Sequence, residues 1–243
     1  MNLLEKTAVL TGGGSGIGLG IAHALAGAGC RVAIAGRREA PLRQAAEEWV
    51  GEPALCYHTV DVTDRDAVSQ LFEWANDRLG KVDILVNSAG TNIATRTMSE
   101  MTPQQWDQMM GANATGAYNC MYAVLPQMRA RRDGLIINIS SVAGKRALSP
   151  AGIAYCASKF AMTALGTAVG QEEAANGIRV TNIYPGEVNT SLLDRRPNPV
   201  SDKRKAAILQ PEDIGPLVVA IAALPARAHV PEIVIKPTIQ EYA

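Results

Sequence analysis

The sequence of 243 residues lacks several features that mark specialised classes of protein. Lys plus Arg and Asp plus Glu both total 23, so no excess of one charge predicts binding to nucleic acid or to a membrane surface. The apolar runs are too short to cross a membrane. Charged residues also appear too early after Met1 for a secretory signal peptide. We therefore expect a cytoplasmic protein that binds neither nucleic acid nor membranes.

Cysteine and histidine are also scarce. They lie far apart along the chain and form neither a CxxC pair nor a zinc-ligand spacing: Cys30, Cys56, Cys120, Cys156, His23, His58 and His229. The spacing predicts reduced, partly buried thiols and no metal site.

Short runs rich in apolar and β-branched residues alternate with longer segments of helical periodicity. The expected strands are Thr7–Leu10, Arg31–Ala35, Ala54–Val60, Ile84–Asn87, Leu135–Ile139, Val180–Tyr184 and Glu232–Ile235. The expected helices lie near residues 16–28, 40–50, 64–79, 102–130, 155–175 and 212–224. This alternation predicts an α/β fold, a doubly wound, seven-stranded parallel sheet of the Rossmann type with helices on both faces. Residues 1–243 are enough for one such domain.

Residues 189–205 break this periodicity. The segment is rich in Arg, Pro, Asn, Ser and Lys. Two interpretations remain open: a plain surface loop, or a substrate-side loop that closes over the active site.

The first expected strand leads directly into a glycine-rich turn, Thr11–Gly18, and then into a helix. Glycine lets the backbone approach a ligand closely, and the amino end of a helix attracts a pyrophosphate. The usual GxGxxG spacing is absent, and the glycines that fit are Gly12, Gly16 and Gly18. The position of this turn predicts dinucleotide binding.

The end of the second strand indicates which dinucleotide binds. An acidic residue there would hydrogen-bond to the adenosine ribose of NAD, and a methyltransferase would need a similar carboxylate for S-adenosylmethionine. The sequence instead has Gly36, Arg37 and Arg38. Two solvated arginines are one interpretation, but cations are unfavourable at the amino end of a helix, whereas a guanidinium can hold a 2′-phosphate. The pattern favours NADP(H).

Tyr155 and Lys159 stand four residues apart in an alanine-rich helical segment. This spacing places both side chains on one face of the helix. A nearby ammonium favours the phenolate, and so lowers the pKa of a tyrosine toward the range where it can act as a general acid or base. By itself such a pair is more often found at a surface, so its meaning depends on its context.

That context resembles the short-chain dehydrogenase/reductase family over nearly the whole chain. The matching motifs occur in the family's order: Thr11–Gly18 for TGxxxGxG, Asp61 and Val62 for the adenine-contacting pair, Asn87–Gly90 for NNAG with Ser88 as a departure, Asn113, Ile139–Gly144 for the catalytic-serine segment, Tyr155 and Lys159 for YxxxK, and Tyr184–Gly186 with Thr190 for PG…T.

The resemblance implies a role for each matching residue. Tyr155 exchanges a proton with the substrate oxygen, and Lys159 lowers the pKa of Tyr155 and holds the nicotinamide ribose. Ser141 hydrogen-bonds to the substrate oxygen, and Asn113 helps to hold a water that links Lys159 to solvent. The implied cofactor-binding residues are Gly12, Gly14, Ser15, Gly16, Ile17, Gly18, Arg37, Arg38, Asp61, Val62, Asn87, Ala89, Gly90, Tyr155, Lys159, Pro185, Gly186, Val188 and Thr190.

Ser140 and Ser141 compete for the serine role. Ser141 stands fourteen residues before Tyr155, one more than is usual in the family. We prefer Ser141 because Gly144 then aligns with the family's glycine and one extra residue falls in 145–154.

The resemblance predicts an NADP(H)-dependent oxidoreductase that interconverts a small carbonyl compound and an alcohol, and a homo-oligomer, either a dimer or a tetramer, formed through the helices near 102–130 and 155–175. The tail after residue 232 looks more like that of reductases of small aldehydes, ketones or hydroxy acids than like that of enzymes for acyl-carrier substrates. Glu187 is either a surface carboxylate or a group that favours a polar or cationic substrate. The alternative function is a nucleotide-sensing regulator on the same fold, although such proteins typically lose the tyrosine or the lysine.

Overall fold

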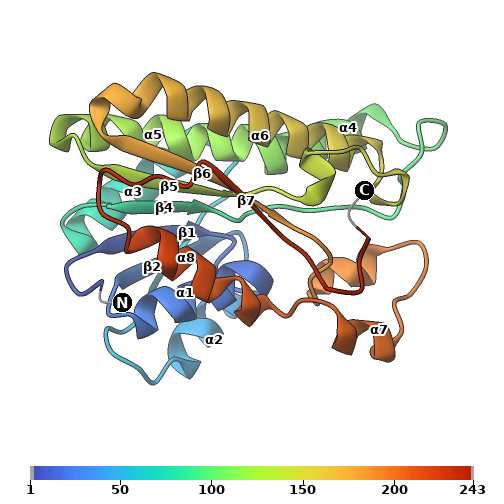
Figure 1. The fold of residues 1–243 in the computed structure, drawn as a ribbon, viewed down its shortest axis with the longest axis horizontal. Coiled ribbons are helices and arrows are strands. Elements are labelled where there is room, and N and C mark those ends of the chain that lie inside the picture. Colours follow the sequence, from blue (N-terminus) through green and yellow to red (C-terminus); the bar gives the residue numbers. More distant parts are fainter. Residues whose placement is uncertain (1–2, 242–243) are drawn as a thin grey trace.

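The computed structural model describes residues 3–241. All strand pairs are parallel, and the sheet has the order β3-β2-β1-β4-β5-β6-β7 (Figure 1). The strands are β1 (Thr7–Thr11), β2 (Arg31–Gly36), β3 (Cys56–Thr59), β4 (Ile84–Asn87), β5 (Gly134–Ile139), β6 (Ile178–Pro185) and β7 (Glu232–Ile235). The predicted doubly wound fold is confirmed, and every predicted strand is present.

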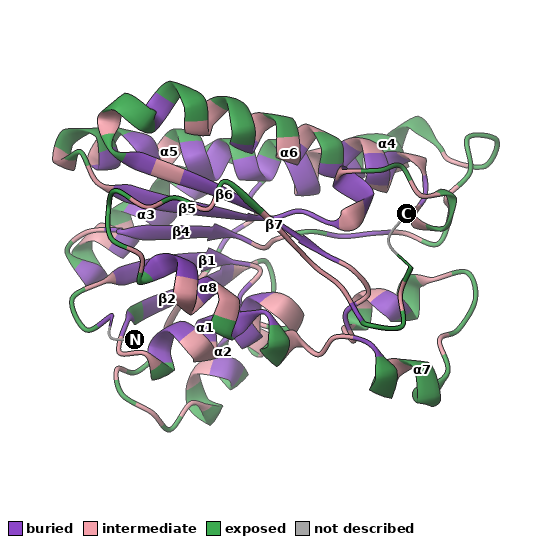
Figure 2. Cartoon of the chain, in the orientation of Figure 1, coloured by how far each residue is buried: buried purple, intermediate pink, exposed green. Residues whose placement is uncertain are grey.

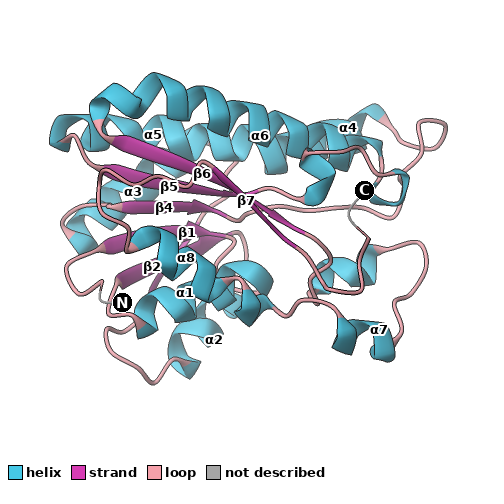
Figure 3. Ribbon diagram, in the orientation of Figure 1, coloured by secondary structure: helices cyan, strands magenta, loops and turns pink. Residues whose placement is uncertain are grey.

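Helices cover both faces of the sheet. They are α1 (Gly16–Gly27), α2 (Glu39–Glu48), α3 (Arg65–Leu79), α4 (Pro103–Met110), α5 (Gly116–Arg131), α6 (Ile153–Glu173), α7 (Asp202–Ala207) and α8 (Gly215–Ala222). In Figure 3, α1, α2 and α8 lie on one side of the strands, and α3, α5 and α6 lie on the other. None of the helices in residues 3–241 has the length and apolar character needed to cross a membrane.

The core consists of one apolar cluster on each face of the sheet. Successive side chains of a strand point to opposite faces, so Ala8 and Leu10 of β1 join one cluster and Val9 joins the other. Because both faces are covered, the central strands are buried along their whole length (Figure 2). This double burial explains why the strands read as continuous apolar runs rather than as an alternating pattern.

The helix predicted near residues 102–130 is divided into three parts. Thr102 and Gln105 form a capping box at the start of α4, a π-helical turn covers Gly111–Thr115, and α5 follows. A Cβ atom on Gly116 would lie 2.4 Å from Cγ2 of Val62, so the chain here passes very close to the segment after β3. The π turn carries Asn113 fully inward, and such turns often occur at functional sites.

The segment 189–205 is more ordered than a simple loop. A 3₁₀ turn covers Ser191–Arg195, and α7 begins at Asp202 after Ser201, whose Oγ accepts a hydrogen bond from the backbone N–H of Arg204. Within this segment, only residues 189–190 and 196–201 lie outside these two elements. Helical periodicity could not reveal α7, because the helix has six residues and buries none of them.

All four cysteines are free thiols, and Cys30, Cys120 and Cys156 are buried, as predicted. Burial raises the pKa of Cys30 and of Cys120 to about 12, which keeps both in the unreactive thiol form.

Candidate active site

The carboxyl edge of the sheet opens into a pocket of about 540 Å³. Carboxyl edges of parallel sheets are the usual place for ligands in this architecture. Many of the predicted site residues line the pocket: Gly12, Gly14, Ser15, Gly16, Ile17, Gly18, Arg37, Arg38, Asp61, Val62, Ala89, Gly90, Tyr155, Lys159 and Thr190. Segments that are up to about 180 residues apart in the chain therefore meet in one cavity.

The glycine-rich turn is packed too tightly for side chains at two of its positions. A Cβ atom on Gly18 would lie 2.3 Å from the carbonyl oxygen of Gly12, and Gly12 itself has a φ of 69°. Ser15 precedes α1 without a side-chain capping bond, and the first turn of α1 has no acidic residue. The positive amino end of α1 therefore stays available to an anion.

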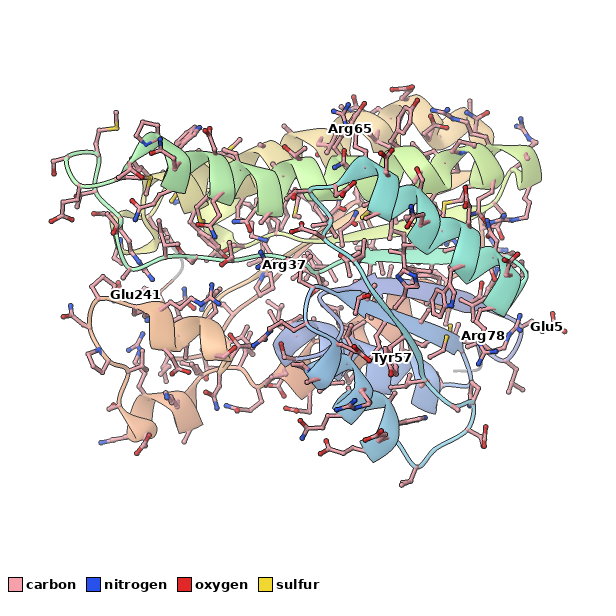
Figure 4. All side chains as sticks on the ribbon, turned by 180° about the vertical axis from the view of Figure 1, so that it is seen from behind. Glu5, Arg37, Tyr57, Arg65, Arg78 and Glu241 are labelled. Atoms are coloured by element: carbon pink, nitrogen blue, oxygen red, sulfur yellow. The ribbon has the colours of Figure 1, made fainter. Side chains whose placement is uncertain are left out.

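Arg37 and Arg38 follow the last residue of β2 and are both exposed. In Figure 4, Arg37 lies far from Glu5 and Arg78, which are labelled at the other end of the strands. Neither arginine forms an ion pair within residues 3–241. Burial acts to raise the pKa of nearby Asp61, but hydrogen bonds from Thr63 and the charge of Arg37 lower it overall. The end of the pocket formed by Arg37, Arg38 and Asp61 thus carries one carboxylate that stays ionised and, among the described residues, two guanidinium groups without an ion pair.

Tyr155 and Lys159 lie one turn apart near the start of α6. The Lys159 side chain is buried, and its Nζ donates a hydrogen bond to the carbonyl oxygen of Ile139, at 2.8 Å. Nζ lies 5.8 Å from the centre of the Tyr155 ring. The lysine is therefore held against the end of β5, beside the tyrosine rather than directly on its hydroxyl group.

Burial is the largest influence on the pKa of both Tyr155 and Lys159. Burial raises the pKa of Tyr155, and the groups that oppose this effect are Ser141, through a hydrogen bond, and the charges of Arg96 and Arg196. The Lys159 ammonium donates to a backbone carbonyl oxygen, and its burial lowers its own pKa to about 8. The effect of Lys159 on the pKa of Tyr155 stays a prediction, and the charges of Arg96 and Arg196 add a positive potential that the sequence did not reveal.

The depressed pKa of Lys159 predicts a pH-dependent stability. Burial lowers this pKa from 10.5 to about 8, so between pH 8 and 10.5 the unfolded chain holds a proton that the folded protein has lost. The contribution of this group to the free energy of unfolding therefore rises with pH across that window. The cost of burying the charge is fully present below pH 8.

Replacing Lys159 with Met should raise the urea midpoint most below pH 8, and the gain should shrink toward pH 10.5. Urea unfolding at several pH values, with the exposed Lys203→Met as control, checks this; a gain that grows with pH would contradict it.

The two candidate serines are separated by their contacts. Ser140 Oγ hydrogen-bonds to the carbonyl oxygen of Lys159 at 3.2 Å and to Thr163 Oγ1 at 3.0 Å, so it fastens β5 to α6. Ser141 Oγ accepts from the backbone N–H of Ala143 at 3.1 Å and hydrogen-bonds to Tyr155. Ser141 is the serine that reaches the tyrosine, which supports the sequence-based preference.

Asn113 is used fully by protein contacts. Its Oδ1 accepts from the backbone N–H of Thr91 at 2.7 Å, and its Nδ2 donates to the carbonyl oxygen of Thr91 at 3.0 Å and to Ser158 Oγ at 2.9 Å. The side chain therefore ties the π turn to the chain after β4 and to α6. A role in holding a water for Lys159 stays a prediction, and any such contact would fall to the remaining lone pairs or to the backbone.

Four of the predicted cofactor-binding residues lie behind the pocket lining. Asn87 Nδ2 donates to Asn138 Oδ1 at 2.9 Å, within a buried row of asparagines that crosses the central strands. Pro185 ends β6, and Gly186 N donates to the carbonyl oxygen of Ile235. Val188 pairs with Leu209 in an isolated bridge. Their contacts to a cofactor stay a prediction.

Several lining residues had no sequence signal that marked them as site residues. They are Pro41, Leu42, Val60, Thr91, Ala112, Ser191, Leu192 and Arg195. Arg195 shows why: its Nη1 donates to Thr91 Oγ1 at 2.5 Å, and these two residues are 104 positions apart in the chain. Only its place in the basic segment 189–205 could have drawn attention to it.

Glu187 is neutralised by two arginines of that segment. Arg196 Nη1 donates to Oε1 at 2.8 Å, and Arg204 donates to Oε2 through two nitrogens. Burial acts to raise the pKa of Glu187, but these two guanidinium groups lower it overall. The carboxylate therefore stays charged and anchors the segment, and this binding leaves it poorly suited to attract a cationic substrate.

Comparison with known proteins agrees with this geometry. The short chain dehydrogenase family matches residues 6–199. An uncharacterised oxidoreductase of Staphylococcus saprophyticus is 34% identical over 239 residues, which cover 98% of this chain and 99% of that protein. An alcohol dehydrogenase from the archaeon Thermococcus sibiricus, complexed with 5-hydroxy-NADP, has a TM-score of 0.86 and 28% identity, with 97% of this chain and 98% of the other covered. The closed form of serine dehydrogenase complexed with NADP⁺ has a TM-score of 0.86 and 29% identity, with 98% and 97% covered. The chain belongs to the short-chain dehydrogenase family of oxidoreductases.

Proposed function

We propose that this protein is an NADP(H)-dependent oxidoreductase that interconverts a small ketone or aldehyde and the corresponding alcohol. The observation that carries the proposal is the position of Tyr155, which hydrogen-bonds to Ser141 and lines the same pocket as the glycine-rich turn and Arg37. A proton donor and a dinucleotide cradle in one cavity are what hydride transfer to a carbonyl requires.

The residues present fit NADP(H). The tight turn at Gly12–Gly18 and the uncapped amino end of α1 offer backbone N–H groups to a pyrophosphate. Arg37 and Arg38 would hold the 2′-phosphate, and both guanidinium groups are free of ion pairs in the described chain. Two structural neighbours, an alcohol dehydrogenase and a serine dehydrogenase, are complexed with 5-hydroxy-NADP and with NADP⁺.

Each active-site residue has a defined task in this proposal. The cofactor, when bound, supplies hydride chemistry. Tyr155 gives a proton to the carbonyl oxygen during reduction, and Ser141 hydrogen-bonds to the same oxygen as negative charge develops there. Lys159 positions the cofactor ribose and its hydrogen bond to Ile139 keeps it in place. The carbonyl compound gains a hydride and a proton, so one NADPH and one proton are consumed for each alcohol formed.

We also propose that the protein forms a homo-oligomer through α4, α5 and α6. Large apolar or aromatic side chains on these helices stay exposed in the single chain: Trp106, Tyr118, Tyr122 and Phe160. Exposed aromatic side chains grouped on neighbouring helices are typical of protein interfaces.

A nucleotide-sensing regulator is the weaker alternative. A regulator has no use for a proton donor, whereas here Ser141 hydrogen-bonds to Tyr155 and Lys159 is held in a buried position. This pre-organised geometry favours catalysis.

A panel of small carbonyl compounds and alcohols tests the proposed function. Reduction is followed as loss of the nicotinamide absorbance with NADPH and, separately, with NADH. We expect turnover of at least one small aldehyde, ketone or oxo acid, with NADPH preferred. Binding of NADPH without turnover of any member in either direction would favour the regulator.

A further inference from the structure

Arg96 is fixed by backbone contacts close enough to Tyr155 for its charge to act on that group. Its Nε donates to the carbonyl oxygen of Ile93 at 3.2 Å, Nη1 donates to the carbonyl oxygen of Pro150, and Nη2 donates to that of Arg195. Its own carbonyl oxygen accepts from the N–H of Ile153, two residues before Tyr155. The arginine thus joins the segment after β4 to the start of α6.

The start of α6 is shaped to receive this arginine. Gly152 precedes α6 with a φ of 90°, and a Cβ atom there would lie 2.9 Å from Cβ of Arg96. A side chain at position 152 would be strained and would push Arg96 away. Three of the five N–H groups of Arg96 donate to carbonyl oxygens, which leaves two for a ligand.

Arg195 supplies a second guanidinium group at the same end of the pocket. It lines the cavity together with Tyr155, and its Nη1 donates to Thr91 Oγ1 and to the carbonyl oxygen of Asn92. Its Nε and Nη2 make no hydrogen bond to the described residues. It ends the 3₁₀ turn Ser191–Arg195, and Lys205 of α7 pairs with the neighbouring Asp194 of this turn.

No carboxylate balances these two arginines. Within residues 3–241, neither Arg96 nor Arg195 forms an ion pair. The only carboxylate that lines the pocket from the described chain is Asp61, which belongs to the adenine end. Glu187 is already bound by Arg196 and Arg204. The charge of Arg96 also reaches the reacting group, because Arg96, like Arg196, acts to lower the pKa of Tyr155.

From this arrangement we infer that the substrate is a short hydroxy or oxo carboxylic acid, whose carboxylate is held by Arg96 and Arg195 while its hydroxyl or carbonyl group faces Tyr155. This inference rests on the proposed function and narrows it to one substrate class. A carboxylate can accept two hydrogen bonds from one guanidinium, which orients the acid as well as binding it. Because the described site has no free carboxylate for an ammonium group, acids without an amino group are favoured over amino acids.

Matched pairs of probes isolate the charge of the substrate. Acetoacetate and methyl acetoacetate share the reacting ketone and differ in the carboxylate. 3-Hydroxypropionate and serine share the hydroxy acid skeleton and differ in the ammonium group. For the wild type we expect kcat/KM at least about 10-fold higher for acetoacetate than for its ester, a difference worth about 1.4 kcal/mol. We expect 3-hydroxypropionate to be oxidised in preference to serine.

Two variants test the arginines separately. Arg96→Gln and Arg195→Gln should each lower kcat/KM for acetoacetate about 10- to 100-fold and leave the ester within about 3-fold. Arg96→Lys should keep more of the kcat/KM for acetoacetate than Arg96→Gln, because lysine keeps the positive charge but lacks the two parallel N–H donors of the guanidinium group. If Arg96→Gln fails to fold, Arg195→Gln still decides the question, because its side chain is exposed. Arg227→Gln, exposed and in the segment before β7, is the matched control.

The outcomes separate the inference from the proposed function. Equal turnover of acid and ester, preference for serine, or variants that lower NADPH affinity as much as acid turnover would overturn the inference and leave carbonyl reduction standing. Absence of turnover with every carbonyl compound would overturn the proposed function. Calorimetric binding of acetoacetate to the protein with NADP⁺ then decides the inference by itself: binding that Arg96→Gln abolishes supports the carboxylate site, and absence of binding refutes it.

Discussion

Replacing Tyr155 with Phe is expected to lower kcat by about 10² to 10⁴-fold, the range that a positioned general acid contributes. The change removes only the hydroxyl oxygen, so the ring stays against Lys159 and the pocket keeps its shape. NADPH affinity should therefore change less than about 3-fold. Steady-state kinetics on the best carbonyl of the panel and fluorescence titration with NADPH measure the two effects.

A matched control makes this result specific. Tyr57 lies on β3 at the edge of the sheet and does not line the pocket, so Tyr57→Phe should keep wild-type kinetics. Residual activity of Tyr155→Phe above about a tenth of the wild type would refute the proton-donor role. A variant that also fails to bind NADPH would instead point to a structural effect of the hydroxyl group.

Replacing Arg37 with Ala is expected to remove most of the preference for NADPH over NADH. Hydrogen bonds to a charged group contribute about 1.5 to 3 kcal/mol, so NADPH affinity should fall about 10- to 100-fold. NADH has no 2′-phosphate and should change less than about 3-fold. The effect should weaken as ionic strength rises, because Arg37 is exposed and its charge is screened by salt.

The control for this experiment comes from the adjoining helix. Arg43 lies on α2, is exposed and pairs with Glu47 one turn further on, and it does not line the pocket. Arg43→Ala should leave both cofactor affinities unchanged. If Arg37→Ala kept the wild-type ratio of NADPH to NADH affinity, the 2′-phosphate site would have to be assigned to Arg38 or elsewhere.

Features that depend on local order along the chain were predicted well. The strands and most helices follow from runs of apolar residues and from helical periodicity, which record burial on one or both faces. The glycine-rich turn, the arginines after β2 and the pair Tyr155 and Lys159 are also local signals, because each consists of neighbouring residues whose spacing already limits their geometry.

Features that depend on which way a side chain turns were not predictable. Only the family resemblance separated the adjacent Ser140 and Ser141. In the structure Ser140 hydrogen-bonds to Lys159 and Thr163, whereas Ser141 reaches Tyr155, because successive residues leaving a strand point in opposite directions. The π turn at Asn113 and the short helix α7 also escaped prediction, since neither changes the hydrophobic pattern strongly.

The amino-acid sequence was sufficient for the doubly wound fold, and it singled out the glycine-rich turn and the pair Tyr155 and Lys159, because these depend on periodicity and on residues close together in the chain. Tertiary structure alone decided the electrostatics around Tyr155. Lys159 is turned toward the carbonyl oxygen of Ile139, while Arg96 and Arg196, whose charges act on Tyr155, belong to segments about 60 and 40 residues away. Electrostatic effects depend on distance and burial in space, which no sequence spacing specifies for residues so far apart.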